Sequence, residues 1–143
     1  MPLPRLIDLG DLREGTPLPE RVLAPGIMDV AKFIGGAGFA IPIFLDPAAA
    51  RDTGLDGPVI PAEYKSAFLL GYLRQLVRPD GRILRLQSGF RRPDYHGNRF
   101  TIGGQVTRVD SVEGGREVNL ELWLEQATGE RSVRSSAVIL LPH

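Results

Sequence analysis

Apolar and polar residues alternate most regularly between residues 117 and 125. In a strand, the apolar side chains of this segment would share one face: Val118, Leu120, Leu122 and Leu124. The opposite face would carry Asn119, Glu121, Trp123 and Glu125. This period of two predicts a strand with one buried face. Segments 83–92, 100–110 and 132–141 are also typical of strands, and turn-forming segments at 94–98, 113–115 and 128–130 separate the four.

Residues 61–77 predict one long helix. Apolar residues occupy most of its faces, so we expect other elements to enclose it: they are Ala67, Phe68, Leu69, Leu70, Tyr72, Leu73 and Leu76. Residues 18–24 predict an earlier short extended segment. Together these elements predict a single α+β domain over residues 1–143, in which an antiparallel five-stranded sheet wraps around a central helix. That arrangement is the hot-dog fold.

The segment between the first strand and the long helix predicts two short helical pieces. Residues 29–34 have helical apolar spacing, and Gly35-Gly36 is expected to end that piece. A second piece begins at Asp46, which suits an N-cap, with Pro47 in the first helical position. Gly54 is expected to close it.

Composition excludes several classes of function. The 143 residues suffice for one domain, and 17 basic residues balance 17 acidic ones, so we expect neither nucleic acid nor membrane as a partner. The absence of cysteine excludes disulfides and thiolate chemistry. We predict no metal and no cofactor. The first residues lack the pattern of a signal peptide, which predicts a cytoplasmic protein.

The segment Phe39-Ala40-Ile41-Pro42-Ile43-Phe44-Leu45-Asp46-Pro47 resembles the catalytic frame of the MaoC-like dehydratase and (R)-specific enoyl-CoA hydratase family. That frame reads aspartate-x-asparagine-proline-x-histidine-x-aspartate. Phe39 stands in the place of the first aspartate, Ile41 in that of the asparagine and Phe44 in that of the histidine. Pro42 and Asp46 match.

Three further stretches resemble the same family in order and spacing. They are Asp46-Pro47-Ala48-Ala49-Ala50-Arg51 with Gly57-Pro58-Val59-Ile60, then Phe90-Arg91-Arg92-Pro93 with Gly97, and then Gly104-Gln105-Val106-Thr107. The resemblance extends from about Gly15 to Leu141 and implies the hot-dog fold predicted above.

The departures from the family bear on chemistry. In active members the aspartate and histidine activate a water that adds to, or leaves, an acyl thioester double bond, and phenylalanine cannot carry a proton for this work. The family also has a glycine near the start of the long helix, where a thioester carbonyl approaches free backbone N–H groups. Ala62 occupies that place here and narrows the approach by one methyl group. We therefore expect Phe39, Ile41, Phe44 and Ala62 to line a substrate pocket.

Glu63, Tyr64 and Lys65, in the first turn of the long helix, are the candidate catalytic residues. The resemblance implies that this turn faces the pocket, and some hot-dog thioesterases use a carboxylate on this helix. The alternatives are structural. Glu63 would interact favourably with the positive end of the helix dipole, the Tyr64 ring would pack in the protein interior, and Lys65 would point to solvent or pair with a carboxylate.

A histidine and two arginines outside the helix are further candidates. His96 lies in the predicted turn at 94–98 and is included among possible substrate contacts, although a turn histidine is ordinarily solvated. Arg91 and Arg92 could contact a phosphate of a pantetheine or nucleotide carrier, but strand alternation would put only one of them on a given face.

Two functions remain open. In the first, the chain binds an acyl thioester, linked to CoA or to a carrier protein, or a related apolar carbonyl compound. It would then be a non-catalytic or accessory subunit, homodimeric or paired with another hot-dog chain that supplies the acid/base residues. In the second, the chain is an enzyme with altered chemistry, a lyase, thioesterase or cyclase of natural-product biosynthesis, that uses Glu63, Tyr64 or Lys65. By resemblance both belong to the dehydratase and hydratase group.

Overall fold

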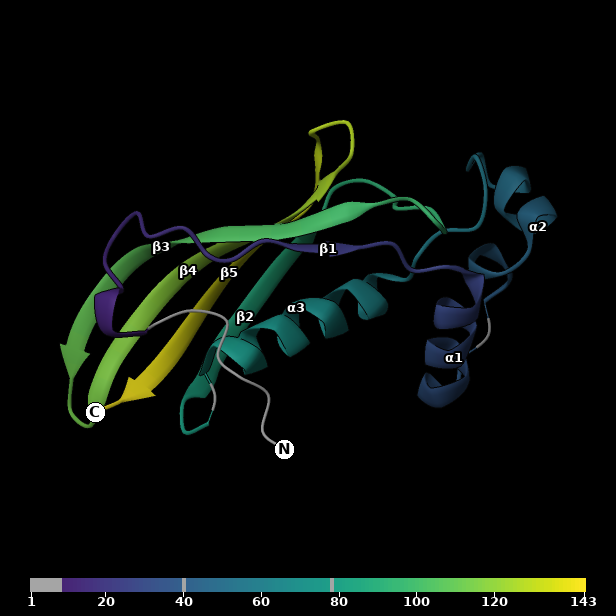
Figure 1. Ribbon diagram of the computed structural model, residues 1–143. Coiled ribbons are helices and arrows are strands. Elements are labelled where there is room, and N and C mark those ends of the chain that lie inside the picture. Colours follow the sequence, from purple (N-terminus) through teal and green to yellow (C-terminus); the bar gives the residue numbers. More distant parts are fainter. Residues whose placement is uncertain (1–8, 40, 78) are drawn as a thin grey trace.

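The computed structural model describes residues 9–39, 41–77 and 79–143. Figure 1 shows a curved sheet with the helix α3 along one face, and α1 and α2 beyond the N-terminal end of α3. The strands are β1 (Arg21–Leu23), β2 (Arg82–Phe90), β3 (Phe100–Val112), β4 (Gly115–Gln126) and β5 (Arg131–Pro142). The helices are α1 (Ile27–Ala37), α2 (Pro47–Asp52) and α3 (Ala62–Val77), with short 3-10 turns η1 (Leu9–Asp11) and η2 (Pro42–Phe44).

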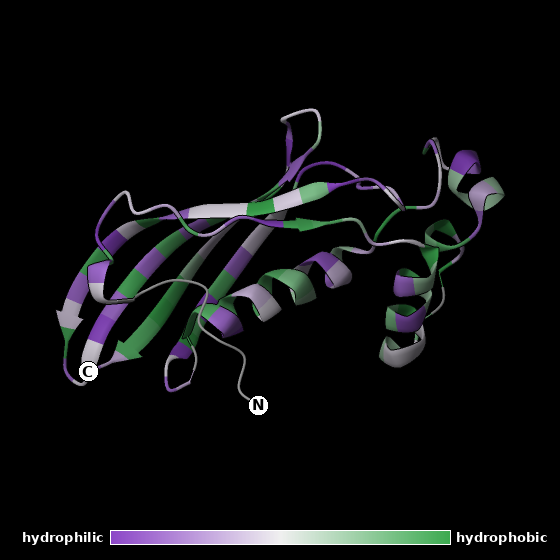
Figure 2. Cartoon of the chain, in the orientation of Figure 1, coloured by the Kyte–Doolittle hydropathy of each residue, from purple (hydrophilic) through white to green (hydrophobic). Residues whose placement is uncertain are grey.

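The five strands form one antiparallel sheet in the order β1-β3-β4-β5-β2. This confirms the predicted α+β hot-dog domain. The alternation in β4 also holds, because Leu122 and Leu124 are fully buried while Trp123 and Glu125 remain partly exposed. Figure 2 shows the same alternation of hydrophilic and hydrophobic positions along the long strands. A one-residue slip of β4 would expose this apolar face, so burial fixes the register.

Only one side of α3 is buried by the rest of the chain. The residues that face the sheet are almost completely inaccessible: Leu69, Tyr72, Leu73, Leu76 and Val77. The Tyr72 hydroxyl donates to the Pro19 carbonyl at 2.6 Å. On the opposite side Ala67 and Gly71 are exposed, and Leu70 is 47% exposed. The prediction that the helix is fully enclosed is therefore wrong for a single chain, because one sheet covers one side of a helix.

Helix α1 is longer than predicted. It begins at Ile27, continues through Gly35 and Gly36, and ends where Gly38 adopts a φ of 78° and donates its N–H to the Ile34 carbonyl. A glycine inside a helix costs about 1 kcal/mol but does not stop it, whereas the left-handed position after the last turn favours glycine strongly. The prediction that Gly35-Gly36 ends the helix is wrong for this reason.

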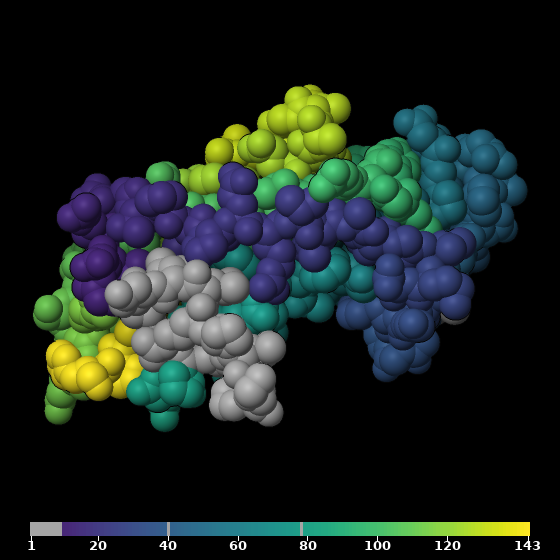
Figure 3. Space-filling model, in the orientation of Figure 1, coloured from purple at the N-terminus to yellow at the C-terminus, as the bar shows by residue number. Residues whose placement is uncertain are grey.

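The start of α2 agrees with the prediction. Asp46 Oδ1 accepts the Ala48 N–H at 2.9 Å as an N-cap, Pro47 is the first helical residue, and Gly54 takes a positive φ after the helix. Backbone hydrogen bonds then tie this region to the rest of the chain, from Val59 N–H to the Ile43 carbonyl and from Ile60 N–H to the Asp94 carbonyl. Figure 3 shows α1 and α2 as a lobe that projects past the sheet.

Candidate functional site

The motif positions hold two phenylalanine rings in contact with each other. Phe39 and Phe44 lie 6.0 Å apart between centroids at 69°, an edge-to-face arrangement, and both are half-buried against the core. Ile41, between them in sequence, is 47% exposed, and Ala40 lies outside the described residues. An aromatic pair of this geometry contributes about 0.5–1.5 kcal/mol beyond its area burial. The segment that resembles the family's catalytic frame is thus packed with aromatic carbon.

These two rings belong to a longer series, which we call the aromatic row. Its six members, in order of contact, are Phe44, Phe39, Phe33, Tyr64, Phe68 and Phe100. Successive centroids lie 6.0, 6.4, 5.0, 4.6 and 6.2 Å apart, and every contact is edge-to-face. The row joins η2 and α1 to the first turns of α3 and to the start of β3, so it runs from the motif to the core of the sheet.

Tyr64 carries the only polar group in the aromatic row. Its ring packs between Phe33 and Phe68, at 5.0 and 4.6 Å. Burial raises the pKa of the Tyr64 hydroxyl, and the charge of Asp29 raises it further. Asp29 is held in place because its Oδ2 accepts the Gly26 N–H at 2.9 Å. At neutral pH the Tyr64 hydroxyl is therefore protonated, and it can donate a hydrogen bond but cannot act as an anionic base.

Two adjoining cavities lie between β1 and α3. One, of about 280 Å³, includes Leu23, Asp29, Tyr64 and Phe68 in its wall. The other, of about 400 Å³, shares Leu23 and Phe68 and continues along α3 past Gly71. Both therefore share a wall made by β1 and the side of α3. We call them together the α3 groove.

Glu63 and Ala62 lie at the exposed N-terminal turn of α3. Neither lines the α3 groove, and Glu63 forms no ion pair with another described residue. The predicted catalytic role of Glu63 and the predicted substrate contact of Ala62 stay predictions. Of the three candidate catalytic residues, only Tyr64 reaches the groove.

Lys65 points into the protein. Its Nζ lies 2.8 Å from Asp94 Oδ2, with side-chain exposures of 4% and 2%, and it donates to the Arg92 carbonyl at 3.2 Å. Asp94 Oδ1 accepts the Gln126 Nε2 amide at 2.8 Å. Pairing of Lys65 with a carboxylate was one of the structural alternatives, but no sequence pattern identifies Asp94 or Gln126 as its neighbours. The geometry is that of a structural ion pair joining α3 to the β2–β3 loop.

His96 is not the solvated turn residue that the sequence suggested. It is half-buried, and its Nε2 is fully enclosed without a hydrogen-bond partner among the described residues. Burial lowers the pKa of His96, while backbone contacts with Val59 and Phe44 oppose that change. The imidazole is therefore neutral at pH 7. A histidine thus lies against the backbone of Phe44, although it comes from a different loop than the family's catalytic histidine.

The expectation that alternation separates Arg91 from Arg92 is wrong. Strand β2 ends at Phe90, so the two arginines follow the strand and do not alternate across it. Both line one surface cavity beside the β4–β5 turn.

Two features are absent from the residues that the structure describes. Across residues 9–39, 41–77 and 79–143, no group of three or more His, Asp or Glu side chains is arranged to hold a metal ion. No helix in this part of the chain is both long and apolar enough to cross a bilayer.

Comparison with solved structures identifies the fold. The (R)-hydratase from A. caviae involved in PHA biosynthesis superposes with a TM-score of 0.83 at 24% identity, over 93% of this chain and 99% of that one. The ChsH1-ChsH2 complex from Mycobacterium tuberculosis gives 0.80 at 16% identity, over 90% and 98%. A MaoC-like dehydratase from Rhodospirillum rubrum gives 0.77 at 18% identity, over 96% and 98%.

These likenesses define the class of domain. The chain has the hot-dog fold found in MaoC-like dehydratases and (R)-hydratases. No protein-family model matches the sequence, and no curated protein sequence matches it significantly.

Proposed function

We propose that this chain binds an acyl thioester, or a related apolar carbonyl compound, and does not itself hydrate or dehydrate it. The observation that carries the proposal is the edge-to-face contact of Phe39 and Phe44, which the resemblance assigns to the two acid/base positions of the motif. Proton transfer needs a titratable group within hydrogen-bond reach of the reacting atoms. Two hydrocarbon rings supply none. Neither ring lines the α3 groove, but the aromatic row joins them to Tyr64 and Phe68, which do.

The α3 groove is the proposed acyl site. Phe68 and the exposed, side-chain-free Gly71 leave an apolar surface along the helix, and the Tyr64 hydroxyl offers a hydrogen-bond donor at one end. Polar side chains also line the groove: Arg21, Asp29, Arg74 and Gln75. A groove that offers an apolar surface and hydrogen-bond donors beside it suits an acyl chain with a carbonyl. Burial of each methylene of such a chain contributes about 0.8 kcal/mol.

We further propose that the chain works as a subunit, in the cytoplasm, paired with a second hot-dog chain. Leu70 on α3 and Leu84 and Phe90 on the edge strand β2 are 47%, 50% and 42% exposed. Edge strands with apolar neighbours are association surfaces. The ChsH1-ChsH2 neighbour is itself a complex, which supports pairing of unlike chains. In that arrangement the partner would carry the aspartate and histidine.

The groove can be tested without removing any side chain. Gly71 has open space around its Cβ position, so Gly71→Leu fills the groove and is compatible with a helix. We expect Gly71→Leu to weaken binding of a saturated acyl-CoA by at least about tenfold, measured by calorimetry. Gly36→Leu is the matched control, because Gly36 is also helical, exposed and without neighbours within 4 Å. Equal binding by both variants would contradict the proposed site.

An enzyme with altered chemistry is the second candidate, and the position of Tyr64 favours it. Its protonated hydroxyl in the groove could polarise a thioester carbonyl, with Glu63 on the same turn. This candidate predicts that Glu63→Gln or Tyr64→Phe keeps the fold and lowers activity or ligand affinity by about tenfold or more, roughly 1.4 kcal/mol. If both variants keep full function with the natural partner, the altered-enzyme candidate fails and the accessory role is the one that stands.

A further inference from the structure

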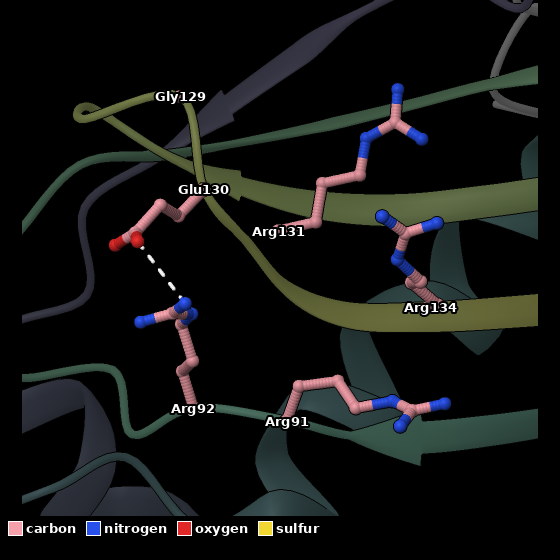
Figure 4. A pocket seen from close by; sticks show the side chains of 6 residues that line it. All are labelled: Arg91, Arg92, Gly129, Glu130, Arg131 and Arg134. Carbon is pink, nitrogen blue, oxygen red and sulfur yellow. Dashed lines mark ion pairs between the residues drawn. The ribbon is translucent and has the colours of Figure 1, made fainter.

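Four arginines surround a cavity of about 610 Å³ beside the turn between β4 and β5. They are Arg91, Arg92, Arg131 and Arg134, and Glu130 and Gly129 complete the lining. In Figure 4 the guanidinium groups of Arg91, Arg131 and Arg134 extend to the same side, whereas Arg92 turns toward Glu130. The cavity lies apart from the α3 groove, because the two share no lining residue.

Backbone geometry positions Arg91 beside Arg134. The Arg91 N–H donates to the Ser132 carbonyl at 2.8 Å, which holds the chain after β2 against β5. Gly89 lies opposite Arg134 in the ladder, and a Cβ on Gly89 would be 3.5 Å from Arg91 Nε. The Arg91 side chain therefore lies over the glycine, next to the strand that carries Arg134.

Arg131 is fixed on the other side of Arg134. Its guanidinium carbon lies 3.7 Å from the centroid of the Trp123 ring, a cation–π contact. Trp123 is opposite Arg134 in the β4–β5 ladder, and its indole covers Gly103, where a Cβ would be 2.6 Å from Nε1. Arg131 and Arg134 both belong to β5, but the Arg131 guanidinium reaches over Trp123 on β4, while Arg91 lies over Gly89 on β2. The three side chains therefore lie over three neighbouring strands, which are about 4.8 Å apart.

The charges of this cluster are only partly balanced. Arg92 pairs with Glu130 at 3.1 Å, and Arg131 pairs with Glu125 at 3.6 Å. Neither Arg91 nor Arg134 forms an ion pair with a described carboxylate. The four arginines carry four positive charges against these two carboxylates, so the cluster holds a local excess of two positive charges.

We propose that Arg91, Arg131 and Arg134 form a binding surface for the phosphate groups of a diphosphate ester. Guanidinium forks match phosphate oxygens in pairs, and arginine is less strongly hydrated than lysine, which favours direct contact. The Trp123 indole holds the Arg131 fork in advance of binding, and the absence of a side chain at Gly89 leaves room for the Arg91 fork beside Arg134. This site does not depend on the acyl-binding role, since it uses none of the residues of the aromatic row or the α3 groove.

The sole tryptophan of the chain makes the proposal directly measurable, because Trp123 lies under Arg131. We expect titration with inorganic pyrophosphate at low ionic strength to change Trp123 fluorescence saturably, and added salt to weaken the binding. Arg91→Gln with Arg134→Gln should weaken it by at least about tenfold. The matched control is Arg82→Gln with Arg85→Gln, which removes two exposed charges that line no part of the cavity and form no ion pair with a described carboxylate, and it should change affinity less than about twofold.

A second titration with adenosine 3′,5′-diphosphate distinguishes the sources of phosphate. Affinity equal to that of pyrophosphate would indicate a site for phosphate groups alone, and tighter binding would indicate a nucleotide ester; both support the proposal. Absence of saturable binding for both probes would overturn it. Equal affinities of the wild type and the Arg91→Gln/Arg134→Gln protein, with both folded by circular dichroism, would overturn it as well.

Discussion

Replacing Lys65 by methionine removes the cation from a buried ion pair and leaves its carboxylate partner unpaired. The Nζ–Oδ2 distance to Asp94 is 2.8 Å, and the two side chains are 4% and 2% exposed. Breaking a pair this deeply buried costs about 3–5 kcal/mol, because the remaining charge loses its partner but does not regain water. A domain of this size has a free energy of unfolding of about 5–15 kcal/mol, so the loss is a large fraction of the total.

Urea unfolding followed by circular dichroism measures this loss. With an m-value of about 2 kcal/mol/M, the midpoint should fall by roughly 1.5–2.5 M. Lys32→Met is the matched control, because Lys32 is the only other lysine and is exposed; its change should stay within about 0.5 kcal/mol. Lys65→Met with Asp94→Leu should recover most of the stability, since Gln126 keeps its 2.9 Å hydrogen bond to the Pro93 carbonyl.

Equal stability losses in Lys65→Met and Lys32→Met would refute the ion-pair account. The same experiment bears on function. If Lys65 were catalytic, its substitution would lower activity with little change in the free energy of unfolding. The buried ion pair predicts instead that the substitution lowers the free energy of unfolding.

Three further changes have defined outcomes. Burial lowers the pKa of His96, so the contribution of its neutral imidazole to the free energy of unfolding is complete above the unfolded pKa of about 6.5 and declines as the pH falls below it. Urea unfolding should therefore show that His96→Gln loses less stability than the wild type between about pH 7.5 and 5.5. Gly103→Ala would place a Cβ 2.6 Å from Trp123 Nε1, so we expect a loss of about 1–3 kcal/mol and a shifted fluorescence maximum. Tyr72→Phe leaves the Pro19 carbonyl without its 2.6 Å donor, and thermal unfolding should reveal a cost of about 1–2 kcal/mol.

The regular elements were predictable because their patterns are local. Alternation in β4 and the apolar run of α3 reflect burial of one face, and both elements appear within three residues of the expected bounds. The positions of glycine predicted the end of α1 poorly. Gly35, Gly36 and Gly38 follow one another closely, and only the left-handed φ of Gly38 identifies the true end of α1.

The candidate site was less predictable because its contacts join distant segments. Lys65 and Asp94 are 29 positions apart, and no periodicity relates them. His96 meets the backbone of Phe44 from another loop for the same reason. The motif frame predicted that Phe39 and Phe44 occupy acid/base positions, but their mutual contact depends on the fold of η2.

Hydration of a 2-enoyl-CoA by the purified chain is the most direct test of the central claim. The loss of absorbance of crotonyl-CoA should proceed no faster than in buffer, because Phe39 and Phe44 supply no group that can move a proton. Binding of a saturated acyl-CoA by the same preparation would establish that the chain is folded and competent. Turnover clearly above the buffer rate, unchanged by Glu63→Gln and Tyr64→Phe, would contradict the assignment of the two phenylalanines to the acid/base positions.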